Sequence, residues 1–382
     1  MGSDVSIIFT IAGIIFISPY LSTILRIPTT PIEIILGSIG GYYALITNNH
    51  ILEILAEVGF FYLMFLAGTE VNFNTLLKMD RTVLKKSLLY LFFLYSFSSI
   101  FSWAFSFNII YVVILPLISV GLILTLYKEF DKNTRWLNLS MQAGILGELI
   151  SIVAITITGA MVVHGVGEEF YTSMIYLVVF LVLMLILFHF FKLLFWWFPE
   201  IKTFLIPLYS DRDEKDIRLS MALFFLMMGV MVVFGLEIAF GAFIAGMFIA
   251  TFFEHQKELP HKLSSFGFGF LIPIFFVYIG SSFDLRSLST DGLIMSALMI
   301  TFSMIAIRVS ASFAFIGYLS FNERILFALS HSMPLTLLVA VATLAYQNNS
   351  IDQLSYRSFI LAGLFEVLVC IIAIKFISKL SK

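Results

Sequence analysis

The feature that most constrains this chain is a succession of apolar segments, each about 20 residues long, separated by short polar stretches. A helix needs about 20 mainly apolar residues to cross the hydrocarbon core of a bilayer, which is about 30 Å thick. The composition agrees, since 60% of the residues are hydrophobic and 12% are charged, whereas soluble domains carry about 25% charged residues. We therefore predict an all-α, polytopic membrane protein.

The apolar segments predict about 13 transmembrane helices. The first segment lacks a basic stretch before it and a small-residue cleavage site after it, which favours a membrane helix over a cleaved signal peptide. The weakest division lies between the eighth and ninth helices, where only residues 235–237 interrupt the apolar run. The expected ranges are 5–25, 31–47, 51–71, 84–105, 108–127, 137–163, 169–198, 218–235, 237–253, 265–283, 292–318, 323–347 and 357–378.

The distribution of basic residues supports this count and orients the chain. Lysine and arginine collect in the cytoplasmic loops of membrane proteins. When the predicted loops are taken alternately, 19 of the 22 basic residues fall on one side, Arg286 and Arg357 fall on the other, and Arg308 lies within a helix. We therefore expect an inner-membrane protein with its N-terminus outside and its C-terminus in the cytoplasm.

No soluble regulatory domain is expected. The long polar stretch at residues 211–218 carries charges of both signs, which is typical of a solvated loop. The sequence contains no G-x-G-x-x-G nucleotide-binding motif. The lone cysteine, Cys370, lies in an apolar run and is expected to be a small packing residue. We predict a single transmembrane domain over residues 1–382, with no cofactor and no nucleic-acid partner.

Thirteen helices can divide as six, one and six. Two six-helix halves separated by one crossing helix enter the membrane with opposite topology, which is the inverted repeat of many secondary transporters. The predicted repeats are roughly 5–163 and 218–378, with a linker helix at 169–198. Two similar segments, 68–76 and 280–288, support this division, because each follows an aromatic-rich apolar run and they lie 212 residues apart.

Two prolines at corresponding positions indicate broken helices. Pro116 and Pro334 lie within the predicted fifth and twelfth helices, 218 residues apart. A proline removes a backbone donor and clashes with the carbonyl one turn earlier, and in lipid the freed groups need a partner. Each proline could merely kink its helix, but the symmetric pair favours two unwound segments facing a midplane site. The candidate broken-helix residues are Pro116, Gly121, His331, Ser332 and Pro334.

Three ionisable side chains lie inside predicted helices, where a charge costs about 2.5–3.5 kcal/mol and usually marks a functional site. Glu148 lies near the middle of the sixth helix, Arg308 in the eleventh and Glu366 in the thirteenth. We predict that Glu148 alternately holds a proton and an alkali cation. Arg308 either pairs with Glu148 or stabilises the unwound backbone, and a static buried ion pair is the structural alternative. Gln142 and Glu366 are further candidates.

A histidine beside the second proline is open to two interpretations. His331 could relay protons, because imidazole titrates near pH 7. A lone histidine in an apolar helix is more often a packed, hydrogen-bonded residue. Both interpretations remain open from the sequence.

Three stretches resemble a known family, namely residues 65–72, 235–246 and 273–280. Over nearly its whole length the chain is similar to the Kef/Nap-type members of the second monovalent cation:proton antiporter family. The glycine-rich stretch 235–246 is the most specific, and its small residues four apart also permit close helix packing. The resemblance implies a sodium/proton antiporter-like fold with two broken crossing helices, an elevator movement of a core domain, and a homodimer.

The resemblance also implies site residues. The family's Thr-Ser segment falls on Ile118 and Ser119, its acidic pair on Gly147 and Glu148, and its membrane-embedded basic residue on Arg308. Ser119 and Glu148 would then bind the transported Na⁺ or K⁺, with Arg308 as a charge partner. This chain departs from the family at the first acidic position and keeps a single titratable carboxylate there. Because arginine does not release its proton at physiological pH, we predict electroneutral one-for-one exchange.

The leading hypothesis is therefore antiport of Na⁺, K⁺ or Li⁺ against H⁺. A sodium-coupled symporter of organic anions on a related scaffold is one alternative, and it would need a roomier polar crevice. A non-transporting membrane sensor derived from an antiporter is another, favoured by the altered acidic pair. An enzyme is not expected, because the H-E-x-x-H and G-x-S-x-G motifs are absent.

Overall fold

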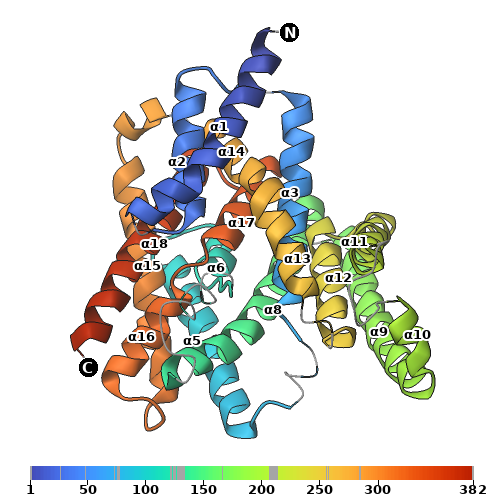
Figure 1. Cartoon of the computed structure of the whole chain (residues 1–382). Helices are drawn as coiled ribbons and strands as arrows, with labels where there is room; N and C mark the ends of the chain where they lie inside the picture. Colours follow the sequence, from blue (N-terminus) through green and yellow to red (C-terminus); the bar gives the residue numbers. More distant parts are fainter. Residues whose placement is uncertain are drawn as a thin grey trace. The chain divides into compact units, whose positions relative to one another are not determined.

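The computed structural model describes residues 2–25, 27–47, 49–72, 74, 78–120, 123, 126, 134–165, 167–205, 214–254, 256, 258–283 and 285–380. Every regular element in these ranges is a helix, which confirms the all-α prediction (Figure 1). The chain forms two compact units. One comprises Met1–Asn49, Lys78–Ile155 and Phe276–Lys382, and the other comprises His50–Leu77 and Thr156–Phe275.

The first unit is a set of packed helices around α15, α18 and two short, interrupted helices. Helix α15 packs against α18, α5 and α16, and α17 packs against α18 and α6. Helices α1 and α2 pack against each other. Its helices are α1 (Gly2–Leu25), α2 (Thr29–Tyr42), α5 (Arg81–Ala104), α6 (Ile109–Ile114), α8 (Arg135–His164) up to Ile155, α14 (Ile272–Ser282) from Phe276, α15 (Leu293–Ala311), α16 (Phe321–His331), α17 (Leu335–Gln347) and α18 (Gln353–Leu380).

The second unit is held by close contact between α3 and α12. A Cβ atom added at Gly246 would overlap the carbonyl oxygen of Phe65, and one added at Gly68 would overlap that of Phe243. The glycine-rich stretch therefore brings two helix backbones together, as its spacing predicts. The helices of this unit are α3 (His50–Thr69), α9 (Glu168–Trp197), α10 (Pro199–Leu205), α11 (Lys215–Phe234), α12 (Ile238–Phe252) and α13 (Leu259–Phe266), followed by a π-helical turn, η1 (Gly267–Leu271).

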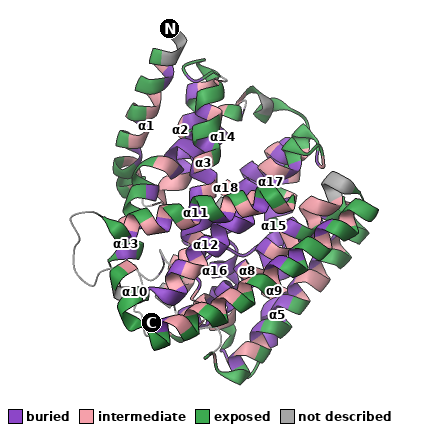
Figure 2. Cartoon of the chain, turned by 90° about the vertical axis from the view of Figure 1, so that its right-hand side faces the viewer, coloured by how far each residue is buried: buried purple, intermediate pink, exposed green. Residues whose placement is uncertain are grey.

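Nine helices in the described part of the chain are long and apolar enough to cross a membrane. Many large apolar side chains on them are exposed, including Phe9 and Phe16 on α1 and Ile186 and Phe190 on α9. Exposed residues run along α1 in Figure 2. Apolar side chains exposed along whole helices indicate surfaces that face lipid.

The predicted helices correspond to the observed ones with local corrections. The uncertain division between the eighth and ninth helices is confirmed, since α11 ends at Phe234 and is followed by Gly235, whose positive φ of 63° suits a residue without a Cβ. Helix α2 ends at Tyr42 rather than at residue 47, because a turn follows in which Ala44 has a φ of 54°. The short helix α10 was not predicted.

Two of the predicted helices are interrupted, as the prolines indicated. Helix α6 ends at Ile114, and residues 117–119 after Pro116 are not helical. Helix α16 ends at His331, and α17 begins after Pro334. Both breaks lie in the first unit. Gly121, which belongs to the first predicted break, lies outside the described residues.

Candidate functional site

The first break exposes backbone groups that a continuous helix would satisfy. Pro116 cannot donate to the carbonyl of Val112 one turn earlier. The Ser98 hydroxyl of α5 donates to that carbonyl instead, at 3.0 Å. This substitution of a side chain for the missing helical donor allows α6 to end within a buried environment.

Side chains from two other helices bind the unwound segment after Pro116. The Leu117 carbonyl accepts a hydrogen bond from Arg308 Nη2 of α15 at 2.5 Å. The Ile118 N–H donates to Ser151 Oγ of α8 at 3.3 Å, and the Val120 N–H donates to Glu148 Oε2 of α8 at 3.2 Å. Since buried backbone groups need partners, α8 and α15 together hold this segment in its non-helical form.

Glu148 is the carboxylate that faces this segment. Its side chain is buried, with 1% of the residue exposed. Besides the Val120 N–H, it is hydrogen-bonded to the Ser119 hydroxyl. Both donors are neutral, so they orient the carboxylate without cancelling its charge. A buried carboxylate in this setting requires a proton or a cation to be electrically neutral.

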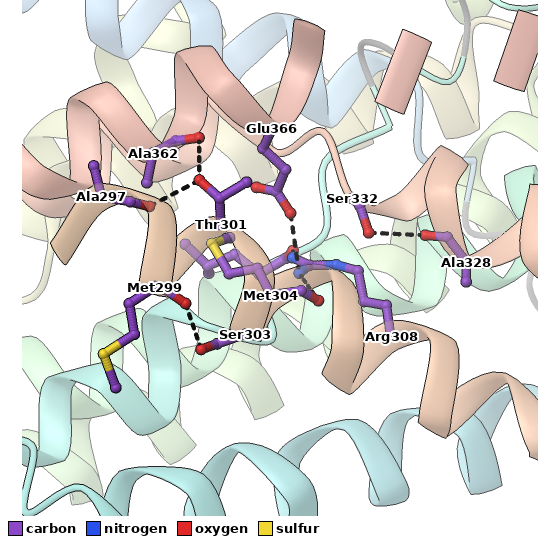
Figure 3. A network of polar contacts seen from close by, with 11 residues as sticks. Ala297, Met299, Thr301, Ser303, Met304, Arg308, Ala328, Ser332, Ala362 and Glu366 are labelled. Carbon is purple, nitrogen blue, oxygen red and sulfur yellow. Dashed lines mark hydrogen bonds and ion pairs between the residues drawn. The ribbon is translucent and has the colours of Figure 1, made fainter. Parts of the chain in front are cut away.

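Arg308 is fully buried, and among the described residues its guanidinium contacts three groups. Figure 3 shows two of the residues concerned, Met304 and Glu366, beside it. Nη2 donates to Leu117, and Nη1 donates to the Met304 carbonyl of its own helix at 2.8 Å. Nη1 also lies 3.4 Å from Glu366 Oε1 of α18, which is likewise fully buried. Of the two roles predicted for Arg308, the structure shows the contact with unwound backbone. Its carboxylate partner in the described residues is Glu366 and not Glu148, because α18 packs directly against α15.

The second break places His331 against α8. Its Nε2 lies 2.9 Å from the Ser140 carbonyl. A carbonyl only accepts hydrogen bonds, so Nε2 carries the hydrogen. The imidazole ring packs edge-on against Phe327, with ring centroids 4.5 Å apart, and lies 5.5 Å from the ring of Tyr90. These contacts are typical of a packed histidine with one hydrogen-bonded ring nitrogen.

Two further predicted residues belong to the same break. The Ser332 hydroxyl donates to the Ala328 carbonyl at 3.0 Å, and Pro334 immediately precedes α17. Ser330 also donates to Ser140 Oγ at 2.9 Å, which strengthens the connection between α16 and α8. The second break is therefore anchored to the helix that carries Glu148.

The structure brings most of the predicted site residues together. Ser119, Glu148 and Arg308 meet around the unwound segment, and Glu366 joins them through Arg308. Gln142 is on α8, six positions before Glu148. Because each helical residue turns by about 100°, Gln142 lies on a different face of α8 from Glu148.

Sequence reasoning missed the serines that support the site. Ser98, Ser140 and Ser151 are all buried and all bind backbone or side chains at the two breaks. A signal was available for Ser151, because a residue three positions after Glu148 lies on the same helix face. No comparable spacing identifies Ser98 or Ser140, since their partners are distant in sequence.

Comparisons with known proteins show which sequences and structures this chain resembles. The family described as "Sodium/hydrogen exchanger, transmembrane" matches residues 12–380. The chain is 26% identical over 335 residues to "Probable Na(+)/H(+) antiporter 3" of Methanocaldococcus jannaschii, covering 85% of this chain and 83% of that protein. It is 25% identical over 348 residues to "Putative Na(+)/H(+) antiporter YjbQ" of Bacillus subtilis, covering 85% of this chain and 54% of that protein.

A solved structure shows the same fold. The sodium proton antiporter MjNhaP1 from Methanocaldococcus jannaschii matches with a TM-score of 0.69 at 17% identity. The match covers 98% of this chain and 97% of that one. The predicted antiporter-like fold is thereby confirmed.

Proposed function

The chain belongs to the sodium/hydrogen exchanger family, and on that premise we propose that it exchanges a monovalent cation, Na⁺ or K⁺, for H⁺ at Glu148. The observation that carries this proposal is the environment of Glu148. The carboxylate is buried and hydrogen-bonded to the neutral Val120 N–H and Ser119 hydroxyl. Arg308, the nearby guanidinium that binds the same segment, is paired with Glu366 instead.

Exchange follows from the competition of two ligands for one negative charge. When Glu148 is protonated it is neutral and does not attract a cation. When it is ionised, its oxygens and the Ser119 hydroxyl can bind a hard cation, which prefers oxygen ligands. Backbone oxygens of the unwound segment and water would complete the coordination. A proton and a cation therefore occupy the site in turn.

The charge balance of the site favours electroneutral exchange. Arg308 and Glu366 contribute opposite charges that cancel, and arginine keeps its proton at physiological pH. Glu148 then provides the single charge that alternates between proton and cation. One cation would cross the membrane for each proton in the opposite direction.

Alternating access requires that the site open to one side at a time. We propose that a core containing both breaks moves as an elevator, in a homodimer of two six-helix inverted repeats. The charge asymmetry of the predicted loops supports a cytoplasmic C-terminus. Within the family, residues 65–72, 235–246 and 273–280 favour the Kef/Nap-type branch.

Purified protein in proteoliposomes with an imposed pH gradient tests the proposal. Addition of Na⁺, K⁺ or Li⁺ to the wild type should collapse the gradient for at least one ion, and Glu148→Gln should abolish this response. Glu53→Gln, which neutralises a half-buried carboxylate on α3, should respond as the wild type does. If the exchange is electroneutral, the rate should stay the same when the membrane potential is clamped at different values.

Two results would contradict the proposal. A Glu148→Gln variant with the wild-type rate would show that Glu148 is not the exchange site. A wild type that responds to no alkali cation would favour the symporter or the non-transporting alternative.

A further inference from the structure

Glu366 holds Arg308 in an unusual way. Its Oε1 lies 3.4 Å from Nη1, a long contact, and its buried Oε2 has no hydrogen-bond partner among the residues that the structure describes. Within the same residues, the Nε atom of Arg308 is also without a partner. A carboxylate and a guanidinium group that bind each other in the optimal geometry usually form two short, parallel hydrogen bonds. The short bond of Arg308 goes to the Leu117 carbonyl instead, so the guanidinium is seated on the unwound backbone.

A buried guanidinium needs a negative charge close by, because removing an ion from water costs several kcal/mol and arginine cannot become neutral. Two buried carboxylates lie near the unwound segment, and Arg308 approaches Glu366 rather than Glu148. The other titratable side chains that face Arg308 are Tyr90, Tyr95, His331 and Cys370. Groups of these types are mainly uncharged near pH 7.5 at their ordinary pKa values, so they supply no negative charge to Arg308.

Helix packing keeps Glu366 within reach of Arg308. The Thr301 hydroxyl of α15 is bound to the Ala362 carbonyl of α18 at 3.2 Å, as Figure 3 shows. Ala362 and Glu366 are one turn apart on α18, and Thr301 and Arg308 are two turns apart on α15. The two contacts therefore fix the same pair of helix faces against each other.

We propose that Glu366 is a positioning residue that supplies the counter-charge of Arg308, so that Arg308 can anchor the unwound segment while Glu148 stays free to bind a proton or a cation. This inference rests on the proposed exchange at Glu148. Glu366 touches neither transported ion and acts through Arg308. Its charge, more than its shape, is what the site requires.

Removing that charge should change how Glu148 binds both ions. In Glu366→Gln the positive charge of Arg308 is uncompensated, and it disfavours protons and cations alike at Glu148. A nearby charge shifts a proton equilibrium by about one pH unit or more, and one unit is tenfold in binding. We expect the pH of half-maximal transport to move about one unit toward acid. The KM for the transported cation should rise about tenfold at alkaline pH, where protons do not compete.

Two variants separate charge from packing. Glu366→Asp keeps the charge and shortens the side chain, so it should keep the wild-type pH midpoint and lose only maximal rate. Glu33→Gln neutralises another buried carboxylate of the same unit, and it should leave the midpoint unchanged. The measurement is pH-gradient collapse in proteoliposomes between pH 5.5 and 9, with Na⁺ or K⁺ varied at each pH (about 0.1 to 100 mM, which spans weak and tight sites).

Cation binding provides a second measurement if Glu366→Gln does not turn over. A bound cation raises the unfolding temperature of detergent-solubilised protein, and titration at alkaline pH gives its Kd. A tenfold weaker Kd in Glu366→Gln supports the inference. An unchanged midpoint and KM, an unchanged Kd, or a shift in Glu366→Asp as large as in Glu366→Gln would overturn it. A wild type without cation-dependent exchange would instead sink the proposed function itself.

Discussion

Gly147 offers a sharp test of the contact between α8 and the unwound segment. It precedes Glu148, and a Cβ added to it would lie 2.6 Å from Ile118 Cδ1 and 3.1 Å from Ile118 Cβ. Comfortable carbon–carbon contacts are about 3.5–4.0 Å. On this helix Gly147→Ala would gain about 1 kcal/mol in helix propensity. Crowding a packed interior costs about 1–3 kcal/mol, so crowding should cancel or exceed the gain.

The same helix contains a matched control. Among the described residues, the nearest neighbour of a Cβ at Gly159 is Glu237 Oε2 at 3.9 Å, an ordinary van der Waals contact, so Gly159→Ala is not crowded. It should stabilise the protein by about 1 kcal/mol through propensity alone. The free energy of unfolding of Gly147→Ala should therefore be lower than that of Gly159→Ala by about 1–3 kcal/mol. Reversible unfolding of the purified protein in mixed micelles measures this difference.

The crowding should be relieved by a smaller neighbour. Ile118→Val removes the Cδ1 atom that lies closest to the added Cβ. A double-mutant cycle should then show a favourable coupling of about 1 kcal/mol between the two substitutions. The transport rates of these variants should follow the same order as their free energies of unfolding, because a displaced Ile118 also moves the Val120 N–H that binds Glu148. If Gly147→Ala were as stable and as active as Gly159→Ala, the proposed contact would be refuted.

Much of the fold followed from patterns that a single sequence displays. The apolar run lengths predicted the helices, and the two prolines predicted both interruptions. These signals are local, because a proline ends a helix through its own ring and missing donor. Boundaries were less certain where a tertiary turn decides them, as at Tyr42 and the turn through Ala44.

The sequence indicated which residues form the candidate site, but it did not indicate which carboxylate pairs with Arg308. Glu148, Arg308 and Glu366 were each conspicuous as ionisable residues within apolar helices. Which carboxylate binds Arg308 depends on how α15 packs against α18, and no spacing within the sequence encodes that. The support from Ser98 and Ser140 was equally hidden, since buried serines are common in membrane helices and their partners lie on other elements.

Two further changes test the support of the unwound segment and the start of α5. Ser151→Ala leaves the buried Ile118 N–H without its acceptor. An unsatisfied buried donor costs about 1–3 kcal/mol, so the free energy of unfolding in micelles should fall by that amount, and Ser151→Thr should lose less. Asp80 caps α5, and hydrogen bonds from the backbone N–H groups of Thr82 and Val83 hold the pKa of its carboxyl below the ordinary 3.8. Since the folded pKa is the lower one, the ionised carboxylate stabilises the fold above pH 3.8, and this contribution is lost as the pH falls through the folded value. Asp80→Asn should therefore be less stable than the wild type at pH 7, and the gap should close in strong acid. A gap between the two proteins that is the same at pH 7 and in strong acid would show that the charge of Asp80 makes no difference to the stability of α5.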